Sequence, residues 1–175
     1  MPADLKIECF WDFSVRTYRS PGVPDACLSL QNDYGADVNM LLFCCWVGAF
    51  VGRFRQDLFK RACEFSTQWT DEVVGPLRSA RTWMKHTGCG VKKVPTEDCM
   101  ALREKIKSIE FESEKLQQEV LESLVTVAVD RAEAVASVQD DVVSNLERYA
   151  EFAGIDLGDD VRQKFSIIIN AAFTR

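Results

Sequence analysis

One run of the sequence limits the possible folds more than any other, because it contains no polar side chain. It extends from Met40 to Val51 (MLLFCCWVGAFV) and follows directly on Gly35-Ala-Asp-Val-Asn39. Asp37 is a strong candidate for a helix N-cap, so a helix is predicted over about residues 38–51. A bilayer span needs roughly 20 apolar residues, and this run ends at Gly52-Arg-Phe-Arg55. A helix that is apolar on every side but too short to span belongs in the core of a soluble bundle.

The remaining chain predicts further helices and no strand. Between Asp57 and His86 apolar residues recur every three or four positions, which indicates one long amphipathic helix. Gly75-Pro76 lies inside this helix. Proline has no N–H to donate and crowds the preceding turn, so a kink is expected near residues 72–76. A second long helix is predicted to begin near Thr96.

Together these elements predict an all-α fold. We expect a helical bundle around the fully apolar central helix at about 38–51, with a long helical hairpin at about 57–125 and two C-terminal helices. The predicted domains are a helical domain with a projecting hairpin at 1–126 and a C-terminal helical extension at 127–175 packed on the same domain.

The second long helix carries a narrow apolar seam between charged faces. Its members follow a spacing of mainly three and four residues: Leu102, Ile106, Ile109, Leu116, Val120 and Leu124. Such a strip normally packs along a single partner helix. Two partner helices are possible: the 57–86 helix of the same chain, or the second long helix of another molecule. We predict a homodimer with Ile109 and Leu116 near its contact.

Composition argues against two classes of partner. The chain has 175 residues and a formal net charge of −6. A negative net charge disfavours general binding to nucleic acids and to membrane surfaces, because both require a positive field. The N-terminus MPADLKIECFWDF lacks a basic segment followed by an apolar core, so no secretory signal is expected and the predicted location is the cytoplasm.

The cysteines do not predict a metal site. There are seven, at positions 9, 27, 44, 45, 63, 89 and 99, and no two of them form a CxxC pair. Adjacent helical residues point about 100° apart, so Cys44 and Cys45 cannot hold one ion without two further ligands. We interpret the cysteines as small buried hydrophobic residues, and we expect no metal and no cofactor.

A candidate polar pocket surrounds the start of the apolar helix. Asn39 enters that helix, and a buried amide must be hydrogen-bonded. One interpretation is a structural amide that bonds a neighbouring helix. The other is a small-ligand pocket in which Asp12, Gln31, Asp37 and Asn39 converge beside aromatic side chains.

A candidate anion or partner contact lies in an acid-free stretch between Gly75 and Thr96. Its basic residues are Arg78, Arg81, Lys85, Lys92 and Lys93. These side chains could bind phosphate or RNA. Alternatively, if the two long helices form an antiparallel hairpin, they face the acidic segment at 97–122 and pair within the chain.

The N-terminal half resembles a known proteobacterial family. The resemblance rests on FWDFSVRTY, on PGVPDACLSLQNDYGADVNMLLFCCW, and on the pattern W-x3-VV-x-PLR-x2-R from Trp69 to Arg81. These motifs are similar to the family described as domain of unknown function 2390. The resemblance covers residues 10–81 and implies a small cytosolic bacterial protein. It supplies no activity.

No catalytic constellation is evident, so we expect no catalytic residues. The leading hypothesis is a non-enzymatic protein-interaction module that binds a protein partner or itself. The alternatives are a small-molecule-binding protein or enzyme with a pocket near Asp12, Asp37 and Asn39, or contact with phosphate or RNA through 78–93. Nucleic acid and membrane are not expected as partners.

Overall fold

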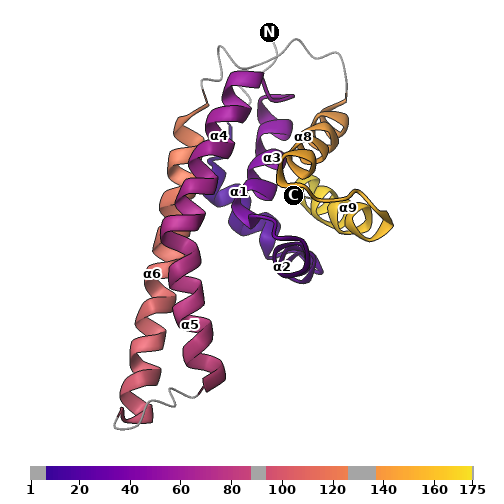
Figure 1. Cartoon of the computed structure of the whole chain (residues 1–175). Helices are drawn as coiled ribbons and strands as arrows, with labels where there is room; N and C mark the ends of the chain where they lie inside the picture. Colours follow the sequence, from indigo (N-terminus) through magenta and orange to yellow (C-terminus); the bar gives the residue numbers. More distant parts are fainter. Residues whose placement is uncertain (1–6, 88–93, 126–136, 175) are drawn as a thin grey trace. The chain divides into compact units, whose positions relative to one another are not determined.

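The computed structural model describes residues 7–87, 94–125 and 137–174, and all regular structure in these residues is helical (Figure 1). The prediction of an all-α fold is confirmed. In chain order the elements are α1 (Phe10–Tyr18), α2 (Val23–Tyr34), α3 (Val38–Phe50), α4 (Gln56–Trp69), the π-helical turn η1 (Thr70–Val74), α5 (Gly75–Thr87), α6 (Thr96–Ser123), α8 (Val138–Ala153) and α9 (Asp159–Phe173).

By its contacts the chain forms two compact units. The first unit comprises residues 1–63 and 118–175, and the second comprises residues 64–117. The boundaries fall within α4 and within α6, so each of these helices contributes to both units. The first unit holds the core around α3, and the second contains the long hairpin.

The centre of the first unit is α3, as its lack of polar side chains predicts. Every residue from Asn39 to Gly48 is buried. Helices α1, α2, α8 and α9 all pack against α3. The helix begins where expected, because the Asp37 carboxylate accepts the backbone N–H of Asn39 at 2.8 Å. Gly35 ends α2 in the left-handed conformation at φ 72°, which a residue without Cβ adopts at little cost.

The closest packing in the first unit joins α3 to α8. A Cβ atom added to Gly48 would lie 2.7 Å from both the Cα and the backbone nitrogen of Val142. Only glycine allows the two helix backbones to approach so closely. One turn further along α8 lies the buried Asn145. Its side-chain oxygen accepts a hydrogen bond from the backbone N–H of Phe54 at 2.9 Å, and its side-chain nitrogen donates one to the carbonyl of Gly52 at 3.0 Å. These bonds attach α8 to the chain that leaves α3.

Aromatic rings fill the contact between α1 and α3. Trp46 lies 5.6 Å from the ring of Phe10 and 6.0 Å from that of Phe43, measured between centroids. Its indole N–H donates to the carbonyl of Glu8 at 2.8 Å. The tryptophan is therefore buried without an unsatisfied donor, and it secures the segment before α1 to the core.

In the second unit, α5 and α6 lie side by side as an antiparallel hairpin (Figure 1). The distortion expected at 72–76 takes the form of the π-helical turn η1. The N–H of Gly75 bonds to the carbonyl of Thr70, five residues earlier. Pro76 has no N–H to continue the α-helical ladder, so the turn widens before it. A Cβ at Gly75 would lie 2.8 Å from the Thr70 oxygen, which explains the glycine there.

The interpretation of the cysteines holds at most of the described positions. Cys27, Cys44, Cys45 and Cys63 are buried. Burial raises the pKa of the Cys27 thiol to about 12, so this group stays protonated at neutral pH. The interpretation is wrong at two positions, for Cys9 is exposed and Cys99 is disulfide-bonded. Neither departure is visible in the hydrophobic pattern.

Candidate functional site

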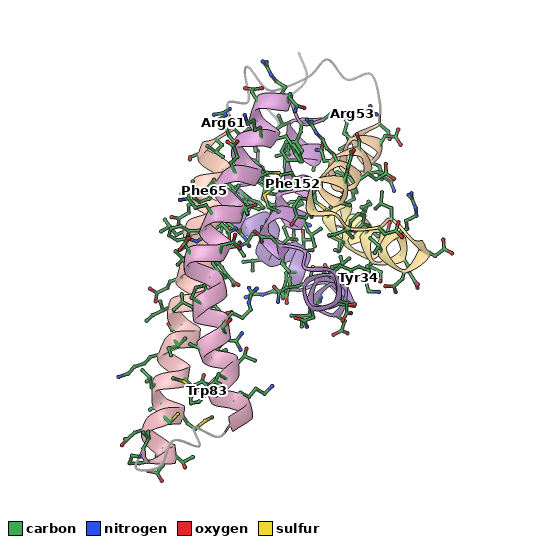
Figure 2. All side chains as sticks on the ribbon, viewed as in Figure 1. Tyr34, Arg53, Arg61, Phe65, Trp83 and Phe152 are labelled. Carbon is green, nitrogen blue, oxygen red and sulfur yellow. The ribbon has the colours of Figure 1, made fainter. Side chains whose placement is uncertain are left out.

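The inner face of the hairpin in the second unit is polar. The buried Gln117 amide donates to the Ser66 hydroxyl at 2.8 Å, and the indole N–H of Trp69 donates to the carbonyl of Ser113 at 3.0 Å. Phe65, labelled in Figure 2, stacks on Trp69 with their centroids 6.1 Å apart. Hydrogen bonds thus hold α4 against α6, and they use a face of α6 that carries few apolar side chains.

An ion-pair cluster continues this inner face toward the tip. Arg78 donates to Glu110 at 3.2 Å and to Glu114 at 2.9 Å, and Arg81 makes two bonds to Glu110. Burial by itself would raise the pKa of Glu110, but the hydrogen bonds and charges of Arg81 and Arg78 outweigh it and lower that pKa. The hydrogen bonds and charge of Glu110 also raise the pKa of Arg81. Both shifts keep Glu110 and Arg81 ionised at neutral pH.

Glu110→Gln is expected to lower the free energy of unfolding at pH 7 by about 2 kcal/mol, because two guanidinium groups lose a buried anionic partner. The side chains of Arg78 and Arg81 are only 28% and 23% exposed, so hydration offsets only part of this loss. The folded-state pKa of Glu110 is lowered, so its contribution is present above the ordinary glutamate pKa and is lost as the pH falls through the lowered value.

Urea unfolding at neutral and at acid pH measures this effect. The difference between wild type and Glu110→Gln should shrink as the pH is lowered. Glu72→Gln, an exposed carboxylate in the same unit, serves as the control and should change little. A difference that is independent of pH would show that the ion pairs do not cause it.

The outer part of α6 carries an exposed apolar stripe. Leu102, Ile109 and Leu116 are 49%, 51% and 45% exposed. They are spaced by seven residues, so they lie on one face of the helix. These three members of the predicted seam therefore lie outside the face that closes the hairpin, which includes Cys99, Glu110, Ser113 and Gln117, whereas the other members, Ile106, Val120 and Leu124, are partly buried. We call Leu102, Ile109 and Leu116 the α6 stripe.

The predicted basic stretch is only partly described. Arg78 and Arg81 lie on α5 and pair with carboxylates of α6, as the intramolecular interpretation requires. Lys85 is exposed on the same helix. Lys92 and Lys93 lie outside the described residues, so a joint anion site at these five positions stays a prediction. Trp83, labelled in Figure 2, is a large exposed side chain nearby on α5.

Two residues of the predicted polar pocket lie together at the start of α3. The Asp37 carboxylate bonds the Asn39 N–H, and the Asp37 backbone N–H donates to the Tyr149 hydroxyl at 2.8 Å. The side-chain oxygen Oδ1 of Asn39 accepts a hydrogen bond of 2.7 Å from the buried side-chain amide of Gln118. Burial, and then the charge of Asp37, raise the pKa of Tyr149, which stays protonated. These contacts join the start of α3 to neighbouring helices, which is the role that the interpretation as a structural amide gives to Asn39.

The other two residues of that pocket lie on different helices. Asp12 is exposed on α1, where its backbone N–H donates to the sulfur of Cys9 at 3.5 Å. Gln31 is partly exposed on α2, and its carbonyl accepts the N–H of Gly35. Convergence of all four residues on one ligand stays a prediction.

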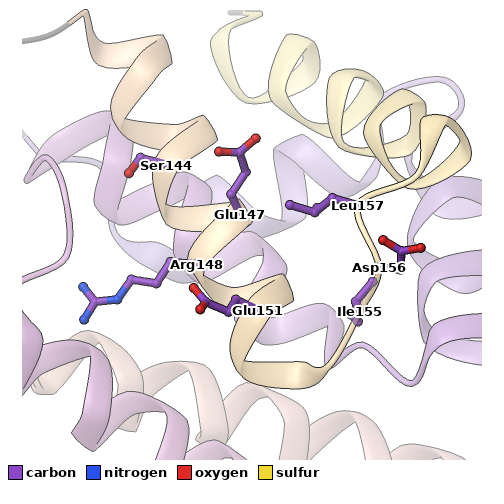
Figure 3. A pocket seen from close by; sticks show the side chains of 7 residues that line it. All are labelled: Ser144, Glu147, Arg148, Glu151, Ile155, Asp156 and Leu157. Carbon is purple, nitrogen blue, oxygen red and sulfur yellow. The ribbon is translucent and has the colours of Figure 1, made fainter.

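An open cavity of about 550 Å³ lies elsewhere, along α8 and the segment that leads to α9 (Figure 3). Its lining residues are Ser144, Glu147, Arg148, Glu151, Ile155, Asp156 and Leu157. Arg148 donates to the Phe54 carbonyl at 2.9 Å and lies 4.2 Å from the centroid of the Phe59 ring. Glu147 pairs with Arg162 at 2.9 Å. Arg148 and Glu147 are thus engaged in holding α8 in place, and no predicted pocket residue lines the cavity.

Within residues 7–87, 94–125 and 137–174, no group of three or more His, Cys, Asp or Glu side chains could hold a metal ion. Among the same residues no helix combines the length and the hydropathy needed to cross a bilayer.

The comparisons with known proteins identify a family. The sequence profile of the family described as "Protein of unknown function (DUF2390)" matches residues 9–121. The chain belongs to this family. The DUF2390 match begins at the cap of α1 and ends within α6, so it includes the α6 stripe and the ion-pair cluster, whereas α8 and α9 follow it. Comparison with curated proteins and with solved structures found no match.

Sequence reasoning named Ile109 and Leu116 but missed two neighbours. Lys105 and Glu112 are exposed on α6, four residues before and three residues after Ile109. At 100° per residue both lie on the same flank of the stripe. The signal in the sequence was this oppositely charged pair, seven residues apart, with one member on either side of Ile109.

Proposed function

We propose that this DUF2390 protein is a non-enzymatic protein-interaction module and that the α6 stripe is its binding surface. The proposal rests on one observation. Three large apolar side chains stand half exposed in register on α6, while the hairpin is closed by a different and polar face of the same helix. Apolar side chains aligned along one exposed helical face are typical of a contact with another protein.

The geometry of the stripe suits a helix or a groove as its counterpart. An amphipathic helix docks in a hydrophobic groove or on another helix through apolar side chains on one of its faces. The alternatives receive less support. Asp37 and Asn39 bond groups of their own protein, and the guanidinium groups of Arg78 and Arg81 bond carboxylates. A small ligand or a phosphate would have to displace these bonds.

Ile109→Asp is expected to weaken association through this surface at least about tenfold, because it places a charge in a contact that excludes water. Stability should be almost unchanged, since Ile109 is about half exposed. The matched control is Phe111→Asp, which puts the same charge on α6 at a residue that is 55% exposed, about 200° around the helix from Ile109.

The test uses the full chain. Wild type and both variants are compared by sedimentation velocity, and each is immobilised and exposed to an extract of the source cells. Partners retained by wild type and by Phe111→Asp should be lost by Ile109→Asp, with equal thermal unfolding of all three proteins. If Ile109→Asp keeps every association of the wild type, the α6 stripe is not the binding surface.

A further inference from the structure

We infer that the α6 stripe binds a second copy of itself, with the two α6 helices antiparallel about a twofold axis at Ile109. This inference rests on the proposed function and identifies the partner for the same surface. It concerns only residues 102–116 of α6, all of which belong to the second unit.

The spacing of the stripe is self-complementary. Leu102 and Leu116 are each seven residues from Ile109, one on either side. Consider an antiparallel pair of α6 helices related by a twofold axis at Ile109. A residue that precedes Ile109 by a given number of positions in one copy then faces the residue that follows Ile109 by the same number in the other copy. Leu102 then meets Leu116 of the second copy, and Ile109 meets Ile109. A twofold contact requires such a self-matching surface, and every molecule carries it.

The stripe is also free of the hairpin contact. Neighbouring residues on a helix point about 100° apart, so Ile109 points about 100° from Glu110, which lies at the centre of the inner face. A helix in an antiparallel four-helix bundle uses two contact faces in this way, one for each neighbour. The α6 helix can therefore keep its bonds to α4 and α5 while its stripe contacts a second α6.

The charges beside the stripe favour the antiparallel arrangement. Lys105 and Glu112 lie on the flank of the stripe away from Ser113, and both are exposed. The twofold axis brings the same flank of both copies together, so Lys105 comes within one residue of a position opposite Glu112 of the second copy. Two such ion pairs form in each dimer. In a parallel dimer the twofold axis runs along the helices and puts these flanks on opposite sides of the contact, so Lys105 and Glu112 of the two copies do not pair.

The contact area implies a reversible dimer. A stripe one side chain wide and three anchors long buries less surface than a standard permanent interface. Dimerisation should therefore depend on protein concentration, and exposed ion pairs should contribute most at low ionic strength.

Charge exchange at Lys105 and Glu112 tests the arrangement in the full chain by sedimentation equilibrium at low salt. Lys105→Glu alone puts glutamates opposite each other in both contacts, and Glu112→Lys alone puts lysines there. Each variant by itself should dimerise about tenfold more weakly than wild type. An equimolar mixture should recover wild-type affinity, because in the mixed dimer both contacts again join opposite charges.

The outcomes separate this inference from the proposed function. A mixture that dimerises no better than its components would overturn the antiparallel twofold contact, as would a wild type that remains monomeric at about 100 µM, where micromolar contacts are populated. If such a monomer still binds a cellular protein that Ile109→Asp fails to bind, the proposed function stands and only self-association falls. If Ile109→Asp changes nothing, both fall.

Discussion

Gly48→Ala is expected to destabilise the protein by about 3 kcal/mol, although alanine is the better helix former. In an open helix interior the change would add roughly 0.5–1 kcal/mol of stability. Here the new Cβ would lie 2.6 Å from Val142 Cγ2 and 2.7 Å from the Val142 backbone. Backbone atoms cannot rotate away as a side chain can. The clash is relieved only if α3 and α8 separate, which loosens the packing along both helices.

Equilibrium unfolding in urea measures this loss. Gly158→Ala provides the matched control, because nothing lies within 4 Å of a Cβ built there and its φ of −68° suits any residue. Because Gly158 is the N-cap of α9, where alanine is less favoured, the control should lose at most about 1 kcal/mol. A Gly48→Ala protein as stable as the control would mean that α3 and α8 are not packed as the structure has them.

Asn145→Asp is expected to cost about 3–5 kcal/mol at neutral pH, although the two side chains have the same shape. The Asn145 amide is 1% exposed. Its nitrogen donates to the carbonyl of Gly52 at 3.0 Å and to that of Cys44 at 3.4 Å. A carboxylate would direct an acceptor at both carbonyl oxygens and bury a charge without a counter-ion. Only the bond from the Phe54 N–H would survive.

The pH dependence of this variant has a defined sign. Burial and the two carbonyls would raise the folded-state pKa of the introduced carboxyl above the ordinary aspartate value of about 3.9. The folded variant then binds its proton more tightly than the unfolded chain does. Its stability relative to wild type should therefore recover as the pH falls toward 4, since a protonated carboxyl can donate to a carbonyl.

Thermal and urea unfolding at several pH values check this expectation. Asn170→Asp, at an exposed position of α9 in the same unit, is the control and should show only a small effect at any pH. A penalty for Asn145→Asp that does not change with pH would contradict the assigned hydrogen bonds.

Local chemistry was sufficient to predict the elements of this fold. Asp37 accepts the amide of Asn39 at the start of α3, and Gly35 ends α2 in the left-handed conformation, as the sequence indicates. Pro76 likewise predicted a distortion of the helix in the turn that precedes it. Each of these outcomes depends on groups within a few residues of one another. Both partners of the interaction therefore lie in one short segment of the sequence, where they can be recognised.

Contacts between distant segments could not be predicted in the same way. The partner of Asn39 is Gln118, and the reason for Gly48 is Val142 on another helix. Nothing near either residue in the chain identifies its partner. A buried amide must be hydrogen-bonded and a glycine permits a close approach, but many segments could have met either condition.

The orientation of α6 is the clearest case. Its spacing alone determined that Leu102, Ile109 and Leu116 share one face. Only the tertiary structure decided that this face stays exposed while Glu110, Ser113 and Gln117 point inward. Periodicity defines the angles between side chains on one helix, but which face closes a hairpin depends on what the opposite helix offers. Here α4 offers a hydroxyl and an indole N–H, and α5 offers two guanidinium groups. These polar groups bond to oxygens and amides of α6 and not to its leucines.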